Sequence, residues 1–317
     1  MSETKNLLEI EFTNDIFFEL MPEWQGAEVD IKILSGGITN KLYRVQSERG
    51  DVAVRIYGDK TGLFIDRDYE ADAIEKMAVV GISPKLIKYL PEWSVTIVEY
   101  ITGSYTLKNP DFLKEELREK IVDPIRRIHN SGKLLPKLFN PLIEVKKMAG
   151  ILEKLNVSYP EFDIEGTIKT LAKISKIANI PENEYTASHN DLLAENFIMV
   201  TEGSEGKYSE PMYIIDWEYA GMAPRYYDIG DMFQEILVPR EVEKSIVEHY
   251  CEGRDFDKNV YLIDLFKPFP DIYWFLWSMI QKNISKIEFD FYNYGKVKYE
   301  NARGNIEFVK EEYGVKI

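Results

Sequence analysis

The sequence predicts an α+β protein with two lobes, a small amino-terminal lobe built on an antiparallel sheet and a larger lobe that is mainly helical. Its 317 residues exceed the roughly 250 residues at which single hydrophobic cores begin to stop growing. Apolar and polar residues alternate over much of residues 30–100, as in half-buried strands. Beyond residue 103 apolar residues recur every three or four positions, as in helices. We therefore place the first lobe at residues 1–102 and the second at residues 103–317.

Five strands and one helix are predicted in the first lobe. Residues 30–57 contain three alternating segments separated by two glycine-containing turns, which predicts three antiparallel strands. A helical pattern then opens at Asp66 and closes at Gly81. Residues 85–90 and 94–100 are apolar segments on either side of a turn, and they complete a strand-strand-strand-helix-strand-strand order.

Three further segments carry a readable pattern. Residues 1–29 contain apolar residues at helical spacing, which predicts a helix that packs either on the first lobe or on a second subunit. Early in the second lobe a helix with a kink at Pro124 is expected from the spacing of Leu113, Leu117, Ile121, Ile125 and Ile128. Residues 197–200 and 212–215 are short apolar segments around a polar turn, and they predict a β-hairpin.

Composition and charge narrow the class of partner. The chain has 54 acidic and 39 basic residues, a net charge of −15. Nucleic acid and anionic membranes are poor partners for it, because both require a basic face. A cationic ligand suits it better. Cys251 is the one cysteine, so no intramolecular disulfide can form, and acidic residues near the start argue against a secretion signal. The longest apolar run, residues 273–280, is too short for a bilayer, so we expect a cytoplasmic protein without membrane insertion.

A second-lobe motif points to phosphoryl transfer. In His189-Asn190-Asp191 the aspartate precedes Asn196 by five positions, and Asp216 follows an apolar strand. This spacing lets Asp191 face an acceptor hydroxyl while the oxygens of Asn196 and Asp216 face Mg²⁺, and phosphoryl transfer depends mostly on such positioning and charge neutralisation. Two unrelated acidic turns would be the alternative. His189 is expected to brace this loop, and His129 and His249 are expected to be solvated or to cap helices.

A candidate nucleotide site lies in the first lobe. In Ser35-Gly36-Gly37-Ile38-Thr39-Asn40 the glycines allow backbone amides to approach phosphate oxygens, although an ordinary hairpin turn has the same composition. Arg55 can pair with Glu70 and direct its charge at phosphates, or both can be ordinary surface residues. Glu99-Tyr100-Ile101 lies at the end of the fifth predicted strand, where a hinge could pair with adenine through its backbone.

Two tryptophans mark a candidate cation site. Trp274 and Trp277 are three residues apart, which places them on one face of a predicted helix. Such a pair either packs in the core or contributes ring faces to a cage for an ammonium group. Tyr292 or Tyr294 could supply a third ring.

With these residues in place, the chain resembles the choline/ethanolamine kinase family, within a wider group that includes aminoglycoside phosphotransferases and, more distantly, protein kinases. The resemblance covers nearly everything after Ile31 and implies a protein-kinase-like two-lobed fold. It rests on the motifs above, on Tyr227-Asp228-Ile229-Gly230-Asp231, and on the block from Trp274 to Phe291, which aminoglycoside enzymes lack. Compared with protein kinases, Arg55 stands in place of a lysine.

The resemblance implies an ATP-dependent, Mg²⁺-dependent kinase that acts on the hydroxyl of choline, ethanolamine or both. Asp191 would be the catalytic base, Asn196 and Asp216 the metal ligands, and the remaining nucleotide residues Ser35, Gly36, Gly37, Thr39, Asn40, Arg55, Glu70, Glu99, Tyr100 and Ile101. The ammonium pocket would be lined by Trp274, Trp277 and Tyr294, with Glu235 and Asp231 adding negative charge. A homodimer is a further possibility. The alternatives are a kinase for an aminoglycoside or amino sugar, and a module that binds an ammonium or nucleotide without turnover.

Overall fold

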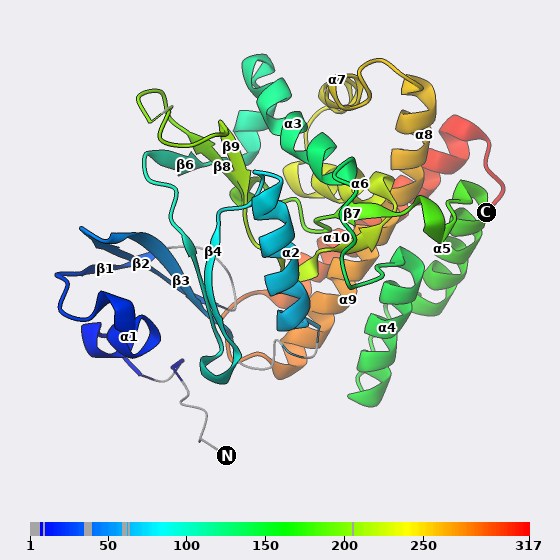
Figure 1. Cartoon of the computed structure of the whole chain (residues 1–317). Helices are drawn as coiled ribbons and strands as arrows, with labels where there is room; N and C mark the ends of the chain where they lie inside the picture. The colour runs from blue at the N-terminus through cyan, green and yellow to red at the C-terminus, as the bar shows by residue number, and fades with distance from the viewer. Residues whose placement is uncertain (1–6, 9, 35–39, 59–61, 63, 205) are drawn as a thin grey trace. The chain divides into compact units, whose positions relative to one another are not determined.

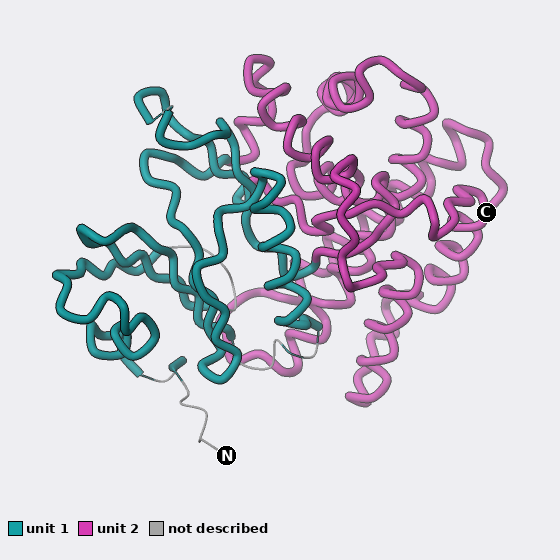
Figure 2. The backbone as a smooth tube through the Cα atoms, viewed as in Figure 1, with its two compact units in different colours: residues 1–107, 195–219 teal, residues 108–194, 220–317 magenta. Residues whose placement is uncertain are grey.

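The computed structural model describes residues 7–8, 10–34, 40–58, 62, 64–204 and 206–317 (Figure 1). The chain forms two compact units, which Figure 2 shows in different colours. Unit 1 comprises residues 1–107 and 195–219, and unit 2 comprises residues 108–194 and 220–317. A single division at residue 102 would assign residues 195–219 to the second lobe, whereas in the structure this segment belongs to unit 1.

The main sheet of unit 1 has five strands in the order β1-β2-β3-β5-β4, and each neighbouring pair is antiparallel. This confirms the five predicted strands. Their bounds are β1 Asp30–Leu34, β2 Lys41–Ser47, β3 Gly50–Ile56, β4 Leu86–Leu90 and β5 Val95–Glu99. In this register Arg55 of β3 lies between Leu42 of β2 and Thr96 of β5, so a cation occupies the central strand.

Two helices flank this sheet in the sequence. Helix α1 (Asn14–Leu20) starts where the Thr13 hydroxyl accepts a hydrogen bond from the Ile16 amide, and its Phe17 is buried in one apolar cluster with residues of β2, β3 and β5. The amino-terminal helix therefore packs on the sheet of its own unit. Helix α2 (Arg67–Val79) begins at the predicted position, because the Asp66 carboxylate caps its first amides.

The predicted hairpin is confirmed and extends into a second sheet of unit 1. Strand β8 (Phe197–Val200) pairs with β9 (Met212–Ile214) and with β6 (Ser104–Thr106), in the order β6-β8-β9. The Ile214 amide donates a 2.8 Å hydrogen bond to the Ile82 carbonyl, just after α2. The hairpin is thereby attached to the unit formed by the beginning of the chain.

Unit 2 is mainly helical, with one short antiparallel pair, β7 (Thr186–Ser188) and β10 (Gly221–Ala223). The long apolar helix α9 packs against both α4 and α10. The helices are α3 Arg118–His129, α4 Pro141–Lys154, α5 Ile164–Ala178, α6 Arg225–Ile236, α7 Arg240–Cys251, α8 Phe256–Phe266, α9 Pro268–Ile284 and α10 Phe291–Tyr313. Helix α3 is shorter than expected: Leu113 and Leu117 lie in two preceding 3₁₀ turns, because Lys114 takes an extended conformation between them.

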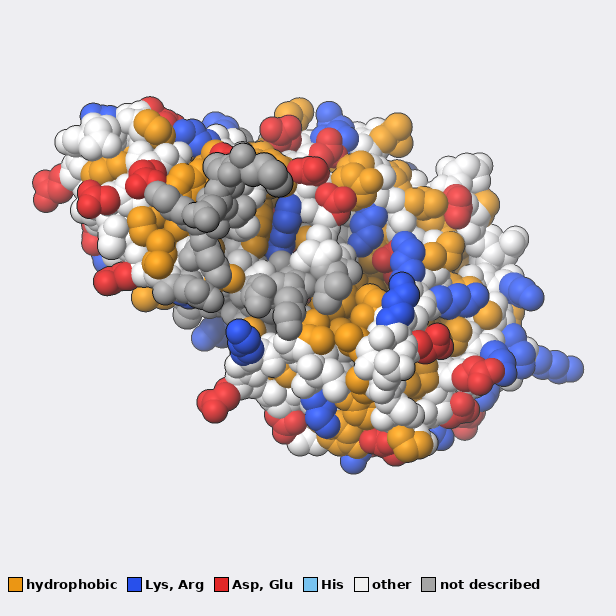
Figure 3. All heavy atoms as spheres, turned by 90° about the horizontal axis from the view of Figure 1, so that it is seen from below, with side chains coloured by type: hydrophobic (Ala, Val, Ile, Leu, Met, Phe, Trp, Pro, Cys, Tyr) orange, Lys and Arg blue, Asp and Glu red, His pale blue; other side chains and the backbone are white. Residues whose placement is uncertain are grey.

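The surface carries charges of both signs. On the face seen in Figure 3, Lys and Arg side chains are interspersed with Asp and Glu side chains and with apolar ones. Within the part of the chain that the structure describes, no helix is both long and apolar enough to cross a bilayer.

Candidate active site

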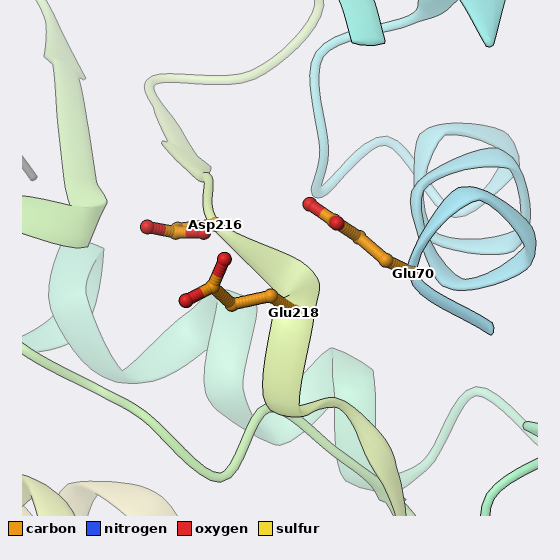
Figure 4. Close-up of side chains that lie close together, drawn as sticks. All are labelled: Glu70, Asp216 and Glu218. Carbon is orange, nitrogen blue, oxygen red and sulfur yellow. The ribbon is translucent and has the colours of Figure 1, made fainter. Parts of the chain in front are cut away.

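Unit 1 contains a cluster of charges around Arg55. The Arg55 guanidinium forms ion pairs with Glu70 of α2 and with Asp216, which follows β9. Arg67, in the first turn of α2, contacts Glu70 at 2.6 Å and Glu218 at 3.0 Å. Figure 4 shows the Glu70 side chain pointing toward the segment that carries Asp216 and Glu218, and one oxygen of each of the three carboxylates lies within 4.8 Å of the others. The structure therefore brings the predicted partners Arg55 and Glu70 together and adds Asp216 to them.

Burial and charge compete in this cluster. Burial lowers the pKa of Arg55, but the carboxylates of Asp216 and Glu218 outweigh it and raise that pKa above its ordinary value. Burial and the nearby Asp216 raise the pKa of Glu218. Arg55 thus remains a permanent cation beside an excess of carboxylates, as expected for a group that meets phosphate oxygens.

The described end of the predicted phosphate loop reaches this cluster. The Asn40 carboxamide accepts a 3.0 Å hydrogen bond from the Gly58 amide and lies 3.5 Å from the Glu218 carboxylate, to which it donates. Ser35, Gly36, Gly37 and Thr39 lie outside the described residues.

The β8–β9 hairpin sets the positions of the two predicted metal ligands. Phe197 pairs with Ile214, and the next residues outward are joined by a 3.0 Å hydrogen bond from the Ile215 amide to the Asn196 carbonyl. Asp216 follows with a positive φ of 68°, so the backbone turns sharply there. Carboxylate and amide oxygens are suitable ligands for Mg²⁺, and this donor set fits that ion. Glu218, which no motif singled out, adds a further carboxylate because the 3₁₀ turn Trp217–Tyr219 follows Asp216 directly.

Two of the three predicted hinge amides are already engaged within unit 1. The Glu99 amide donates to the Lys85 carbonyl at 2.9 Å and the Tyr100 amide donates to the Asp51 carbonyl at 3.0 Å. Among the described residues the Ile101 amide makes no hydrogen bond. Of the three, Ile101 is therefore the one whose amide remains able to pair with a base.

In unit 2, helix α6 holds the loop that carries Asp191. The fully buried Asp228 carboxylate accepts hydrogen bonds from the His189 amide at 2.9 Å and from the Asn190 amide at 2.7 Å. Asp231, one turn later, accepts from the Leu192 amide at 2.9 Å. The amides on both sides of Asp191 are thereby fixed by two carboxylates of one helix. The His189 contact is made by its backbone amide, so a bracing role for its side chain stays a prediction.

The expectation for His129 was wrong. Its ring is buried, with Nδ1 2.7 Å from the Tyr250 hydroxyl and Nε2 2.9 Å from the Asp228 carboxylate. Burial lowers the pKa of His129 despite the neighbouring Asp228. Burial alone would raise the pKa of Asp228, but the hydrogen bonds from His129 and from the His189 amide lower it overall. A neutral His129 donating to an ionised Asp228 satisfies this arrangement.

The three predicted pocket rings lie together in unit 2. The ring centres of Trp274 and Trp277 on α9 are 5.8 Å apart with an interplanar angle of 80°. Tyr294 on α10 lies 6.4 Å from Trp277, at 75°. The indole Nε1 of Trp274 donates a 3.0 Å hydrogen bond to Asp231. Burial and the nearby Glu235 raise the pKa of Asp231, which its two N–H donors oppose.

A lysine that the sequence reading missed lies beside these rings. Lys298 is 5% exposed; its ammonium is 2.5 Å from Glu235 and 3.1 Å from the Gln234 carbonyl. Burial lowers the pKa of Lys298, but Glu235 and Asp271 outweigh it and raise that pKa. One oxygen of Glu235 is therefore already paired with an internal cation. Spacing on α10 gave no signal for this, since a lysine on a surface helix ordinarily faces solvent.

An open pocket of about 800 Å³ lies elsewhere on unit 1, between residues 10–15 and strands β1 and β2. Of the predicted site residues that the structure describes, none lines it.

Known proteins with similar sequences and structures indicate the family of this chain. The family model for choline/ethanolamine kinase matches residues 31–262. Ethanolamine kinase 2 of Mus musculus is 27% identical over 309 residues, which cover 89% of this chain and 77% of that protein. The Plasmodium vivax ethanolamine kinase structure has a TM-score of 0.80 and 21% identity, covering 96% of this chain and 93% of that one. The choline kinase LicA of Streptococcus pneumoniae has a TM-score of 0.76 and 24% identity, covering 92% and 98%. The two structures share the protein-kinase-like fold expected from the sequence. Because the family model spans well over half of its residues, this chain belongs to the choline/ethanolamine kinase family.

Proposed function

We propose that this protein transfers the γ-phosphoryl group of ATP to the hydroxyl of choline or ethanolamine. The observation that carries the proposal is the link, within unit 2, between the Asp191 loop and the aromatic rings: α6 holds the loop amides and Asp231 of α6 also holds Trp274. Choline and ethanolamine have only two carbons between nitrogen and oxygen, so their ammonium site and their general base must be close neighbours. Burial raises the pKa of Tyr294, and the charges of Glu235 and Asp191 add to this effect, which is consistent with such proximity.

In the reaction Asp191 accepts the hydroxyl proton as the oxygen bonds to the γ-phosphorus and the bond to the β-phosphate oxygen breaks, releasing ADP. Arg55, oriented by Glu70, would neutralise phosphate charge, and Asn40 would help to hold the phosphates. Asn196 and Asp216 would hold Mg²⁺, which when bound offsets the charge on the phosphate oxygens. The Ile101 amide would donate a hydrogen bond to adenine. A structure of LicA in complex with AMP supports nucleotide binding in a related fold.

The ammonium group of the acceptor would rest against Trp274, Trp277 and Tyr294, since each ring face contributes about 0.5 to 2 kcal/mol to binding a cation. A trimethylammonium needs only ring faces, whereas a primary ammonium also needs acceptors, and Glu235 retains one carboxylate oxygen beyond its contact with Lys298. Both acceptors therefore suit the site. The product, phosphocholine or phosphoethanolamine, would serve phospholipid synthesis.

The test is ADP production from ATP and magnesium with choline, ethanolamine or kanamycin offered separately, and with Asp191→Asn as the control. We expect turnover of choline or ethanolamine that is lost in Asp191→Asn. Turnover of kanamycin alone would identify the rings as core packing and the enzyme as an aminoglycoside kinase. No turnover of any acceptor would identify a binding module.

A further inference from the structure

Asp231 joins two parts of unit 2 that have separate tasks in the proposed reaction. Its side chain is 0% exposed. One carboxylate oxygen accepts a 3.0 Å hydrogen bond from the Trp274 indole of α9, and the other accepts a 2.9 Å hydrogen bond from the Leu192 amide, adjacent to Asp191. Each oxygen therefore has an N–H donor from the protein.

This arrangement changes the role that the sequence alone implies for Asp231. A carboxylate that served the substrate ammonium would need to face the pocket, whereas Asp231 is fully buried and each of its oxygens already accepts an N–H from the protein. Glu235, one turn further along α6, has a different environment, because one of its oxygens contacts Lys298. Asp231 and Glu235 thus have separate tasks, and Asp231 acts on protein groups.

We propose that Asp231 is a positioning residue through which Trp274 sets the position of the Asp191 loop, so that ammonium binding against Trp274 is coupled to placement of the general base. This inference rests on the proposed function. Loss of the donor to a buried carboxyl group leaves an unsatisfied acceptor, and a displacement of about 1 Å in a reacting group can lower a rate about 100-fold. A change at the Trp274 indole can therefore alter the rate of phosphoryl transfer through the Asp231 side chain alone.

Trp274→Phe and Trp277→Phe are a matched pair that isolates this link. Each variant keeps an aromatic ring at its position and removes an indole N–H, but the Trp274 N–H is the one that donates to Asp231. We expect Trp274→Phe to lower kcat about tenfold, the order expected for leaving one buried hydrogen-bond acceptor unsatisfied, and to raise KM for the acceptor. Trp277→Phe should raise KM while kcat stays within about twofold, because no link to the loop is removed.

Asp231→Asn completes a double-mutant cycle. If the indole acts through Asp231, Asp231→Asn should lower kcat markedly in the wild-type and Trp277→Phe backgrounds and much less in the Trp274→Phe background. Additive effects in both backgrounds, or equal kcat for the two tryptophan variants, would overturn the inference. If Asp231→Asn does not fold, the comparison of the two tryptophan variants decides the matter alone.

The wild-type enzyme separates this inference from the function on which it rests. Failure of the wild type to phosphorylate choline or ethanolamine overturns the proposed function, and the inference with it. If the wild type turns over choline or ethanolamine but the effects of the substitutions on kcat are additive, only the inference is overturned. If the kcat effects of Asp231→Asn and Trp274→Phe are sub-additive, and those of Asp231→Asn and Trp277→Phe are additive, the result supports both the proposed function and the inference.

Discussion

Replacing Asp228 by asparagine tests whether α6 holds the Asp191 loop. Asp228 accepts three hydrogen bonds with no exposure to solvent: one oxygen takes the Asn190 amide, and the other takes the His189 amide and His129. Asparagine has the same shape but one acceptor oxygen. If that oxygen keeps His189 and His129, the new amino group faces the Asn190 N–H, and two donors meet.

The magnitude follows from these contacts. Loss of a hydrogen bond to a charged group costs about 1.5–3 kcal/mol. The two bonds that remain become neutral and weaken by roughly 1 kcal/mol each. We therefore expect Asp228→Asn to lower the free energy of unfolding by about 3–5 kcal/mol. The loop should also shift, and a shift of about 1 Å would lower kcat about 100-fold.

Urea unfolding followed by circular dichroism, together with kcat per folded molecule, measures both effects. Asp264→Asn is the matched control: Asp264 is also buried in unit 2 and contacts Arg240, Lys267 and Tyr313, away from the loop. It should lose a similar stability but keep its kcat. If Asp228→Asn kept kcat within twofold of the control, the reasoning about the loop would be refuted.

Three further changes give separate checks. Because burial lowers the pKa of His129 below its ordinary 6.5, the unfolded chain binds more protons than the folded one below that pH, and stability falls on acidification. His129→Gln should make the loss between pH 7 and pH 5 shallower, and an unchanged slope of the urea midpoint against pH would contradict this. Arg55→Lys should raise KM for ATP about tenfold, because one ammonium cannot reproduce the paired contacts of the guanidinium; an unchanged KM would remove Arg55 from the nucleotide site. On α10, Gly304→Ala should stabilise by up to about 1 kcal/mol, since a methyl group there meets nothing within 4 Å. Gly295→Ala should destabilise by about 1–3 kcal/mol, since its methyl would lie 2.0 Å from the Ser278 hydroxyl; equal melting temperatures for the two variants would contradict the packing argument.

Local patterns were sufficient for much of the fold. Strand β3 alternates in burial as its residue types do, and α2 begins at Asp66 because a side-chain cap is a property of adjacent residues. The β8–β9 hairpin could be predicted from the sequence because its two apolar segments flank a polar turn. That the hairpin belongs to unit 1 could not be predicted, because this depends on contacts between residues far apart in sequence, such as Ile214 and Ile82.

The residues of the site also fall into those that the sequence predicted and those that it did not. Arg55, Glu70 and Asp216 could be named from motifs, and the structure brings them together. Glu218 and Lys298 could not, because their surroundings arise from other elements. His129 was misjudged for that reason: its own helix is polar in composition, while the groups that bury it, Asp228 and Tyr250, come from α6 and α7.

The discontinuous composition of unit 1 has a consequence for how the chain folds during synthesis. Strand β6 emerges early, but its neighbour β8 follows roughly ninety residues later, and β9 later still. Helices α3, α4 and α5 of unit 2 come between β6 and β8. Until Ile214 has left the ribosome, the nascent five-stranded sheet lacks the hairpin that completes its unit. Long-range pairing of this kind slows folding. A nascent chain stopped after residue 107 would carry β6 as an unpaired edge, a feature prone to association with other chains.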